Sequence, residues 1–357
     1  MRLSVLSVGY PLAPVGPDAA GGSEQILALL DRELIRRGHR SVVVACTGSR
    51  VHGIFLETQI PSGTIDEAVH SAAQQQHRKS IEWALQQWQF DLIHMHSLDF
   101  HAYLPPPGLP VLVTLHLPPD WYPPEVFHPT RPRTWLHCVS ASQERQCPPS
   151  SALLPYIENG VPLGELTSSA RKRSYVLALG RVCPEKGFHF ALDAAAKAKV
   201  PALVAGEVFR YRAHQEYFDA EIRPRLAPPA RRFLGPVGFA RKRRLLAGAR
   251  CLLIPSLVPE TSSLVAMEAL ACGTPVIAFP VGALPEIVTH GRTGFLVANV
   301  EEMAEAIGQS ALIDSETCRQ EALRRFSADR MLASYFGRYA NLARAACSME
   351  ASGDRSG

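Results

Sequence analysis

The chain has 357 residues, 46% hydrophobic and 20% charged, which is enough apolar material for two buried cores and predicts two domains. Its net charge of +4 fits an anionic ligand or a membrane surface but is too weak to predict nucleic-acid binding. No apolar segment reaches the ~18 residues that a membrane-spanning helix needs.

The eight cysteines are scattered, with neither CxxC nor zinc-type spacing, and several lie within apolar runs. We interpret them as free thiols in a reducing compartment. A predicted strand begins at Leu3 with no apolar leader ahead of it. These features predict a cytoplasmic protein, with a peripheral position on the inner face of a membrane as the second option.

The first predicted unit is strand–helix–strand. An apolar strand spans residues 3–8, a helix with one apolar face spans 24–37, and a second strand spans 41–45. Ser23 is the expected helix cap. Before it stand Gly21 and Gly22, which either let a ligand approach the helix N-terminus or form a plain turn.

The alternation of strands and helices continues through the N-terminal half. It predicts a helix over 65–88 and strands over 91–96, 111–116, 135–140 and 152–157. Alternating elements of this kind predict a parallel sheet covered by helices.

Three histidines stand at predicted strand ends: His94, His96 and His116. Ligands of open α/β sheets gather at the carboxyl ends of strands. The His-x-His pair suggests a metal, but no carboxylate or third ligand follows at ligand spacing. The alternative for His94 is a polar strand end that bonds to local backbone. The aromatic loop 118–132, with Trp121, either stacks on a bound substrate or packs on its own domain.

The C-terminal half begins after a polar linker over 164–174. A strand over 175–180 leads through a loop to a helix ending at 199, and the loop holds Arg181 and Lys186. Two cations beside a helix N-terminus suit a diphosphate.

Further elements follow in the same order. A strand over 202–205, a helix over 211–226 and a short strand over 232–235 precede the basic run 241–244. This run opens a helix, which favours a solvated face, with a membrane-surface contact as the alternative.

The stretch 259–277 combines an anion site with two carboxylates. Between buried strands, a helix over 264–271 is preceded by Thr261, Ser262 and Ser263 and ended by Gly273. A helix N-terminus presents unpaired N–H groups and favours phosphate. Glu260 and Glu268 would repel a phosphate, but as pure acceptors they suit the hydroxyls on either side of a diphosphate.

Glu260 and Glu268, with seven residues between them, resemble the Glu-x7-Glu motif of retaining glycosyltransferases of the GT-B group, family 4 (group 1). The resemblance runs from Arg2 to about Arg338. It implies an α/β protein of GT-B architecture, with two Rossmann-like doubly wound domains and an interdomain cleft.

The same resemblance implies the domain limits. Residues 1–163 would form the N-terminal, acceptor-side domain and 174–328 the nucleotide-sugar domain. A helix over about 329–347 would pack back on the first domain, and 348–357 would be a disordered tail.

The resemblance also implies roles for individual residues. Glu268 would hold the ribose, Glu260 and His116 would lie near the transferred sugar, and Arg181 with Lys186 would hold the diphosphate. Of these, His116, Glu260, Arg181 and Lys186 form the predicted catalytic set. The other expected donor contacts are Gly21 and Gly22 at the phosphates, Gly206 and Val237 near the base, and Thr261, Ser262, Ser263 and Leu264 at the helix N-terminus.

The implied reaction moves a hexose from a nucleoside diphosphate sugar to an acceptor hydroxyl with retention of the anomeric configuration. A UDP-sugar, with UDP-glucose as the example, is the favoured donor. No Asp-x-Asp motif occurs, so we expect no metal ion and no other cofactor. The open alternatives are a nucleotide-sugar epimerase of the same fold and a non-catalytic nucleotide-sugar binder.

Overall fold

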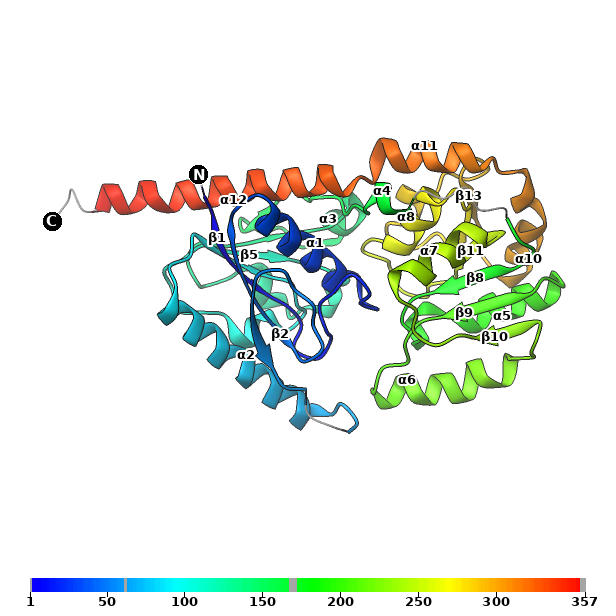
Figure 1. The fold of residues 1–357 in the computed structure, drawn as a ribbon, viewed down its shortest axis with the longest axis horizontal. Coiled ribbons are helices and arrows are strands. Elements are labelled where there is room, and N and C mark those ends of the chain that lie inside the picture. The colour runs from blue at the N-terminus through cyan, green and yellow to red at the C-terminus, as the bar shows by residue number, and fades with distance from the viewer. Residues whose placement is uncertain (1, 61–62, 167–171, 354–357) are drawn as a thin grey trace. The chain divides into compact units, whose positions relative to one another are not determined.

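The computed structural model describes residues 2–60, 63–166 and 172–353, and the chain folds into two compact units (Figure 1). Unit 1 comprises Met1–Ser62, Asp66–Glu158 and Arg330–Gly357, and unit 2 comprises Gly63–Ile65 and Asn159–Asp329. The change of unit after Glu158 comes before the limit expected at residue 163. Part of the expected linker is the helix α4 (Leu163–Leu166), and its residues 167–171 lie outside the described part.

Unit 1 contains a seven-stranded sheet in the order β3-β2-β1-β4-β5-β6-β7, and every pair in it is parallel. Its strands are β1 (Ser4–Val8), β2 (Arg40–Cys46), β3 (Ile54–Thr58), β4 (Leu92–Met95), β5 (Val111–Thr114), β6 (Thr134–His137) and β7 (Leu153–Leu154). The central strands are buried almost throughout, as expected for a sheet covered by helices on both faces. The edge strand β3 was not predicted.

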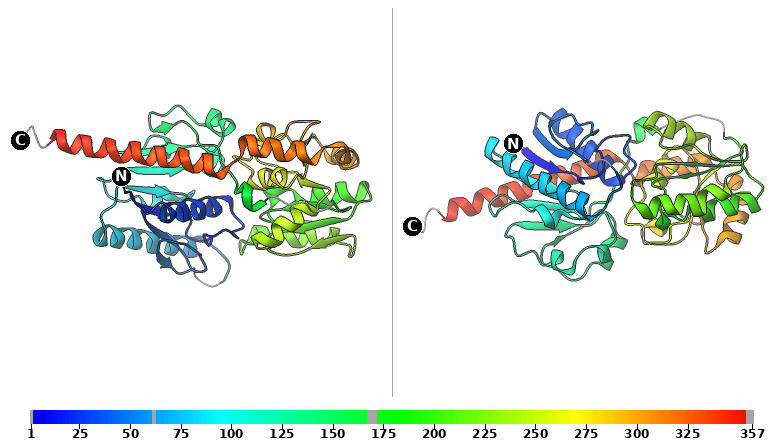
Figure 2. Two further views of the ribbon diagram at one scale, coloured as in Figure 1. Left: turned by 45° about the horizontal axis from the view of Figure 1, so that its top comes forward. Right: turned by 90° about the horizontal axis from the view of Figure 1, so that it is seen from below.

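The longer helices of unit 1 are α1 (Gly22–Arg36), α2 (Glu67–Gln87) and α12 (Ala328–Gly353), with a short α3 (Ala141–Gln146). The expected cap at Ser23 is wrong: α1 begins two residues earlier than predicted, and Gly21 is its N-cap. Figure 2 shows α12 running along unit 1. The predicted disordered tail is wrong up to Gly353, because α12 continues to that residue; residues 354–357 lie outside the described part.

Unit 2 repeats the design with six parallel strands in the order β10-β9-β8-β11-β12-β13. They are β8 (Val176–Leu179), β9 (Ala202–Ala205), β10 (Arg231–Phe233), β11 (Cys251–Ile254), β12 (Val276–Ala278) and β13 (Gly294–Leu296). Apart from the extra β7 of unit 1, both sheets follow the doubly wound order 3-2-1-4-5-6. The direction of winding reverses between β1 and β4 in unit 1 and between β8 and β11 in unit 2.

The other helices of unit 2 are α5 (Phe188–Lys197), α6 (Arg212–Tyr217), α7 (Phe239–Gly248), α8 (Leu264–Ala271), α9 (Leu284–Ile287), α10 (Val300–Gln309) and α11 (Ser315–Arg325). The helix predicted over 211–226 is confirmed as one helical run over 212–225, but its hydrogen-bonding pattern changes along it. After α6 the run continues as a π helix (Phe218–Ile222) and ends as a 3-10 helix (Arg223–Arg225). Pro224 lies in this last part, where a proline cannot donate the N–H of a regular α-helix.

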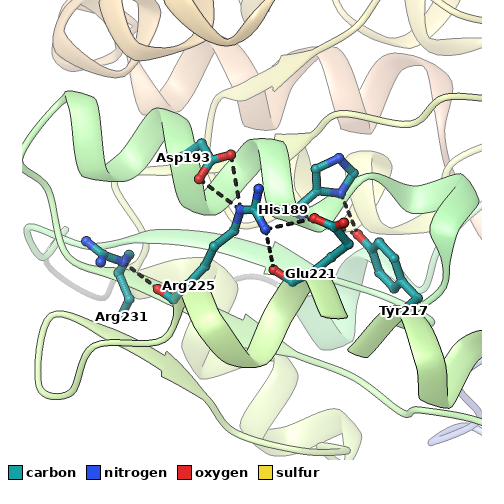
Figure 3. Close-up of polar contacts among 6 residues, drawn as sticks. All are labelled: His189, Asp193, Tyr217, Glu221, Arg225 and Arg231. Carbon is teal, nitrogen blue, oxygen red and sulfur yellow. Dashed lines mark hydrogen bonds and ion pairs between the residues drawn. The ribbon is translucent and has the colours of Figure 1, made fainter. Parts of the chain in front are cut away.

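Polar contacts fix this irregular segment on α5. Figure 3 shows the guanidinium of Arg225 between two carboxylates, with Nε 3.0 Å from Asp193 Oδ1 and Nη1 2.8 Å from Glu221 Oε2. The imidazole Nδ1 of His189 lies 2.9 Å from the hydroxyl of Tyr217. These bonds offset the loss of regular helical hydrogen bonds.

The free thiols include Cys46, Cys138, Cys147, Cys183, Cys251, Cys272 and Cys318, and all of these but Cys147 are buried. Among the described residues, no helix combines the length and apolarity required to cross a bilayer.

Candidate functional site

The predicted diphosphate and sugar residues of unit 2 lie where the winding of its sheet reverses. The loop after β8 carries Arg181 and Lys186, and the loop after β11 carries Glu260. Since β8 and β11 are hydrogen-bonded neighbours, their following loops are adjacent. This is the place where open α/β sheets bind ligands.

Lys186 and Glu260 form an ion pair, with Nζ 2.5 Å from Oε1. The hydroxyl of Ser256 donates to the same carboxylate oxygen. The Glu260 side chain is 7% exposed and that of Lys186 is 24% exposed. A largely buried carboxylate of this kind is stabilised by its cation and its hydroxyl donor. The structure thus brings together two of the four predicted catalytic residues.

Glycines allow the loops around this pair to approach closely. Gly187 has φ +59° and a Cβ there would overlap the carbonyl oxygen of Pro255; Gly282 also has φ +59° and would overlap the backbone of Glu260. The N–H of Ala283 donates to the Glu260 carbonyl at 2.7 Å. Glu260 is therefore held by its backbone as well as by its side chain.

Arg181 is half-buried, and within the described residues its side chain makes no hydrogen bond or ion pair. Its guanidinium therefore keeps its five N–H donors for solvent or a ligand. That Arg181 and Lys186 bind one diphosphate together stays a prediction.

The N-terminus of α8 is not capped by a side chain, and Ser263 occupies the N-cap position. The predicted helix limits and the C-terminal Gly273, with φ +70°, are confirmed. The hydroxyl of Ser262 is buried and has no partner among the described atoms. The N–H groups of the first turn remain donors, so this end of the helix can receive an anion.

Glu268 forms a buried ion pair that sequence analysis missed. Lys242 Nζ lies 2.5 Å from Glu268 Oε1, and the two side chains are 8% and 2% exposed. The second oxygen, Oε2, is buried without a hydrogen-bond partner in the described structure. One oxygen is thus neutralised and the other retains acceptor capacity, which a ligand hydroxyl could use.

Lys242 corrects the interpretation of the basic run. Arg241 and Arg244 are exposed, as a solvated face requires, but Lys242 points inward. It stands four residues before the buried Leu246, on the same side of α7. This four-residue spacing from an apolar position could have predicted from the sequence that Lys242 faces inward.

The residues expected near the base lie at the ends of β9 and β10. Gly206, with φ +147°, approaches so closely that a Cβ would overlap the carbonyl oxygen of Gly180. Its N–H donates to the carbonyl of Gly235 at 2.9 Å. Val237 follows Gly235 on the loop after β10 and is half-buried. Their contact with a base stays a prediction.

In unit 1, His116 follows β5 and is held from both sides of its backbone. The Tyr122 hydroxyl accepts from the N–H groups of His116 and Leu117 at 3.1 and 3.3 Å. The Gln143 amide donates to the carbonyls of Leu115 and Leu117, both at 2.9 Å. The loop 118–132 therefore packs largely on its own domain, as one alternative expected, although Trp121 is 37% exposed.

His94 and His96 bond to side chains rather than to local backbone, which corrects the expectation for His94. Their rings contact each other, and His96 contacts His116. Burial lowers the pKa of both rings well below the ordinary histidine value.

The space left by the missing side chain of Gly21 is filled by Glu24. A Cβ on Gly21 would overlap the Glu24 carboxylate, which lies within the first turn of α1. A carboxylate there already stabilises the helix dipole. Contacts of Gly21 and Gly22 with donor phosphates stay a prediction.

Among the described residues, one group has the donor atoms for a metal ion: Cys183, Glu185 and His214, whose ligand atoms lie within 4.8 Å of one another. Burial lowers the pKa of His214, and the nearby positive charge of Arg181 lowers it further. The same charge would oppose a second cation.

Two family models match the sequence, one in each half. The family described as "Glycosyltransferase Family 4" matches residues 20–148, and the one described as "Glycosyl transferases group 1" matches residues 173–311.

Curated relatives match shorter stretches. A D-inositol 3-phosphate glycosyltransferase of Mycobacterium avium is 37% identical over 152 residues, which is 42% of this chain and 34% of that protein. The same enzyme of Actinosynnema mirum is 43% identical over 83 residues, covering 23% of this chain and 20% of the relative. A glycogen synthase of Mycobacterium tuberculosis is 28% identical over 49% of this chain and 44% of its own length. The alignments thus span less than half of each of these relatives.

Solved structures match nearly the whole fold. Sucrose-phosphate synthase of Thermosynechococcus elongatus has a TM-score of 0.77 at 17% identity, covering 96% of this chain and 100% of its own. The Anabaena protein HepE, solved with UDP and glucose, has a TM-score of 0.74 at 19% identity, with coverage of 95% and 100%. AviGT4, a glycosyltransferase of avilamycin A biosynthesis, has a TM-score of 0.70 at 24% identity, with coverage of 96% and 98%. At these identities the likeness establishes the fold.

Proposed function

The chain belongs to the family 4, group 1 glycosyltransferases of GT-B fold, and on that basis we propose that it transfers a sugar from a nucleoside diphosphate sugar to an acceptor hydroxyl. The observation that carries the proposal is the site of unit 2. There, Lys186 and Glu260 form an ion pair at the point where the winding reverses, and Glu268 carries one unpartnered oxygen.

The donor assignment rests on the charge and hydrogen-bonding capacity of this site. Arg181, Lys186 and the first turn of α8 provide cations and N–H donors for a diphosphate. Glu268 Oε2 provides an acceptor for the ribose hydroxyls. The donor is a UDP-sugar in this proposal, in line with the UDP bound by HepE. A hexose, with glucose as the first candidate, is the transferred group.

The transfer breaks the bond between the anomeric carbon and the diphosphate oxygen and forms a bond to the acceptor oxygen. The leaving diphosphate takes both bonding electrons, and in this proposal it also receives the acceptor proton. Negative charge therefore grows on the diphosphate, where fixed cations and N–H groups stabilise the transition state. The acceptor attacks from the face that the diphosphate leaves, so the anomeric configuration is retained.

The reaction is proposed to need no metal ion, because Arg181, Lys186 and the α8 N-terminus can offset the leaving-group charge. Cys183, Glu185 and His214 have donor atoms that could hold a metal ion, so the effect of added metal tests this part of the proposal. Transfer assayed with EDTA and then with Mg²⁺ or Mn²⁺ should run at the same rate. A rate restored only by added metal would reverse this part of the proposal.

Thermal-shift screening against UDP-, GDP- and ADP-sugars, followed by measurement of nucleoside diphosphate release with and without acceptors, tests the function itself. One UDP-sugar should stabilise the protein, and release should depend on an acceptor hydroxyl. The reported relatives named by activity are transferases or synthases, which favours transfer over epimerisation. An isomerised donor sugar formed without any acceptor would indicate the epimerase instead, and binding without release would indicate a non-catalytic binder.

A further inference from the structure

Four histidines and a threonine form a continuous hydrogen-bonded chain through the buried sheet of unit 1. From His116 Nε2 it passes to His96 Nδ1 at 3.0 Å, and from His96 Nε2 to His94 Nδ1 at 3.1 Å. It continues from His94 Nε2 to Thr114 Oγ1 at 2.7 Å and from Thr114 Oγ1 to His137 Nε2 at 2.7 Å. It ends at the carbonyl of Cys138, 3.0 Å from His137 Nδ1.

The rings in the chain are neutral. Burial lowers the pKa of His94 and His96 well below the ordinary value, lowers that of His137 to about 3, and lowers that of His116 as well. A neutral imidazole has one N–H donor and one bare acceptor nitrogen. A ring that accepts a hydrogen bond at one nitrogen must therefore donate one from its other nitrogen.

The carbonyl of Cys138 sets the direction, because it can only accept. His137 must carry its proton on Nδ1, so its Nε2 is an acceptor and the Thr114 hydroxyl donates to it. The Thr114 oxygen then accepts from His94, whose proton is on Nε2. The Tyr335 hydroxyl, 3.3 Å away, can donate to the second lone pair of Thr114.

The direction of the remaining links depends on the single lone pair of His94 Nδ1. This nitrogen is now an acceptor, and its lone pair is shared by two donors, the Tyr339 hydroxyl at 2.6 Å and His96 Nε2 at 3.1 Å. A bare His96 Nε2 would place two lone pairs against each other, so this nitrogen carries the proton. His96 Nδ1 then accepts from His116 Nε2, which is protonated.

We propose that the Cys138 carbonyl, acting through His137, Thr114, His94 and His96, fixes His116 as the Nε2–H tautomer. These four side chains are positioning residues for His116 in the proposed transfer, so the functional part of the inference rests on the proposed function. The Nδ1 atom of His116 is then a hydrogen-bond acceptor. A sugar hydroxyl that reaches this nitrogen must donate its proton to the bond, and His116 cannot protonate a substrate from Nδ1.

A purely structural role explains the chain less well. Apart from Thr134 at the start of β6, the other residues of β4, β5 and β6 are apolar, and valine or leucine at 94, 114 and 137 would pack without polar groups to satisfy. A chain of this kind is favourable only when every member is satisfied. Here each buried N–H and hydroxyl of the chain has an acceptor, and the chain leads to the ring predicted to meet the substrate.

The first test reads the tautomers directly, by long-range ¹H–¹⁵N NMR of protein labelled at histidine nitrogens, with His→Gln variants for assignment. The expected pattern is asymmetric: His137 protonated on Nδ1, and His94, His96 and His116 protonated on Nε2. A His116 ring protonated on Nδ1, or one exchanging between tautomers, would overturn the proposal. This readout needs no substrate, so it stands or fails separately from the transferase activity.

A matched pair of variants tests the connection. Thr114→Val keeps the side-chain shape but removes the hydroxyl that joins His94 to His137, whereas Thr114→Ser keeps the hydroxyl. The valine variant should release His94, His96 and His116 from a single tautomer and lower kcat about tenfold to a hundredfold with little change in donor KM. The serine variant should retain both the tautomers and kcat. If His116 kept a single Nε2–H tautomer in Thr114→Val, the proposal would be contradicted. Loss of that tautomer in a folded Thr114→Ser variant would contradict it as well.

Discussion

At the scale of single residues, the site of unit 2 depends on two ion pairs that differ in burial. Lys186 is partly exposed beside Glu260, so it can turn toward a ligand, whereas Lys242 is buried against Glu268. The first lysine is therefore suited to the substrate and the second to holding a carboxylate in place.

Lys186→Ala should lower kcat about a hundredfold to a thousandfold, because it removes a fixed charge from the leaving diphosphate. The matched control is Lys197→Ala on α5, an exposed lysine that pairs with Glu301. Steady-state donor turnover measures both variants, and circular dichroism checks their fold. Equal turnover of the two variants would remove Lys186 from the diphosphate.

Lys242→Met should destabilise the protein by about 3–5 kcal/mol, because it leaves the Glu268 carboxylate buried without its cation. Adding Glu268→Leu to this variant should recover most of the stability, since two apolar side chains then replace the pair. Nucleotide affinity should be lost in the double variant, because Glu268→Leu removes the proposed ribose acceptor. Denaturant unfolding and UDP titration separate these effects, and Arg241→Met, an exposed neighbour on α7, is the control.

If the double variant bound UDP as the wild type does, Glu268 would not be the ribose acceptor. If the single variant were as stable as Arg241→Met, the buried pair itself would be in doubt.

The sequence predicted the location of those site residues that are placed by the strands and helices next to them in the chain. Arg181, Lys186 and Glu260 were placed correctly in loops at strand ends, because the strand–loop–helix pattern alone puts them there. The partner of Glu268 was not predicted, because Lys242 lies 26 residues away on another helix and the two meet only through packing. The histidine chain has the same origin, since it joins three strands and α12.

At the scale of elements, strands and helices with strong burial patterns were predicted within a few residues, α8 and β9 with their observed limits. The strand β3 was missed because it is an edge strand with mixed exposure, although Ile54, Phe55 and Leu56 form an apolar run. The 3-10 end of the helical run over 212–225 could have been inferred from Pro224. The π segment before it was not predicted, and Arg225, which follows that segment, contacts Asp193 on α5 (Figure 3).

The close approach of the β8 and β9 loops predicts a difference between two glycines. Gly206→Ala should lower the free energy of unfolding by about 3 kcal/mol or more, because its φ is positive and its Cβ would overlap Gly180. Gly235→Ala, at the end of the adjacent strand, also has a positive φ but meets no atom within 4 Å. It should cost only about 1–2 kcal/mol.

Urea unfolding of both variants measures this difference. Equal losses would mean that backbone conformation alone, and not the contact between the loops, limits these positions.

At the scale of the whole molecule, the buried histidines predict that unit 1 is acid-sensitive. Burial lowers the pKa of His77 to about 4 and of His137 to about 3, and lowers those of His94 and His96 well below 6.5. The unfolded chain binds protons below about pH 6.5 that the folded chain does not bind. Stability is therefore full above that pH and falls as the pH decreases toward the folded pKa values.

Each such histidine should lower the free energy of unfolding by up to about 1.4 kcal/mol per pH unit in this range. All four tryptophans of the chain, Trp83, Trp88, Trp121 and Trp135, lie in unit 1, so their fluorescence follows this unit alone. Urea unfolding at pH 7.5, 6 and 5 should show a steep loss of stability. The same slope should persist in His128→Asn, a variant of an exposed histidine. A flat profile would show that the rings take up protons in the folded state.

The account as a whole depends on how unit 2 binds its donor, and a crystal structure with a nucleoside diphosphate sugar tests this most directly. We predict that the diphosphate contacts Arg181, Lys186 and the first turn of α8, and that a ribose hydroxyl donates to Glu268 Oε2. A ligand bound elsewhere, or a ribose that does not contact Glu268, would contradict it.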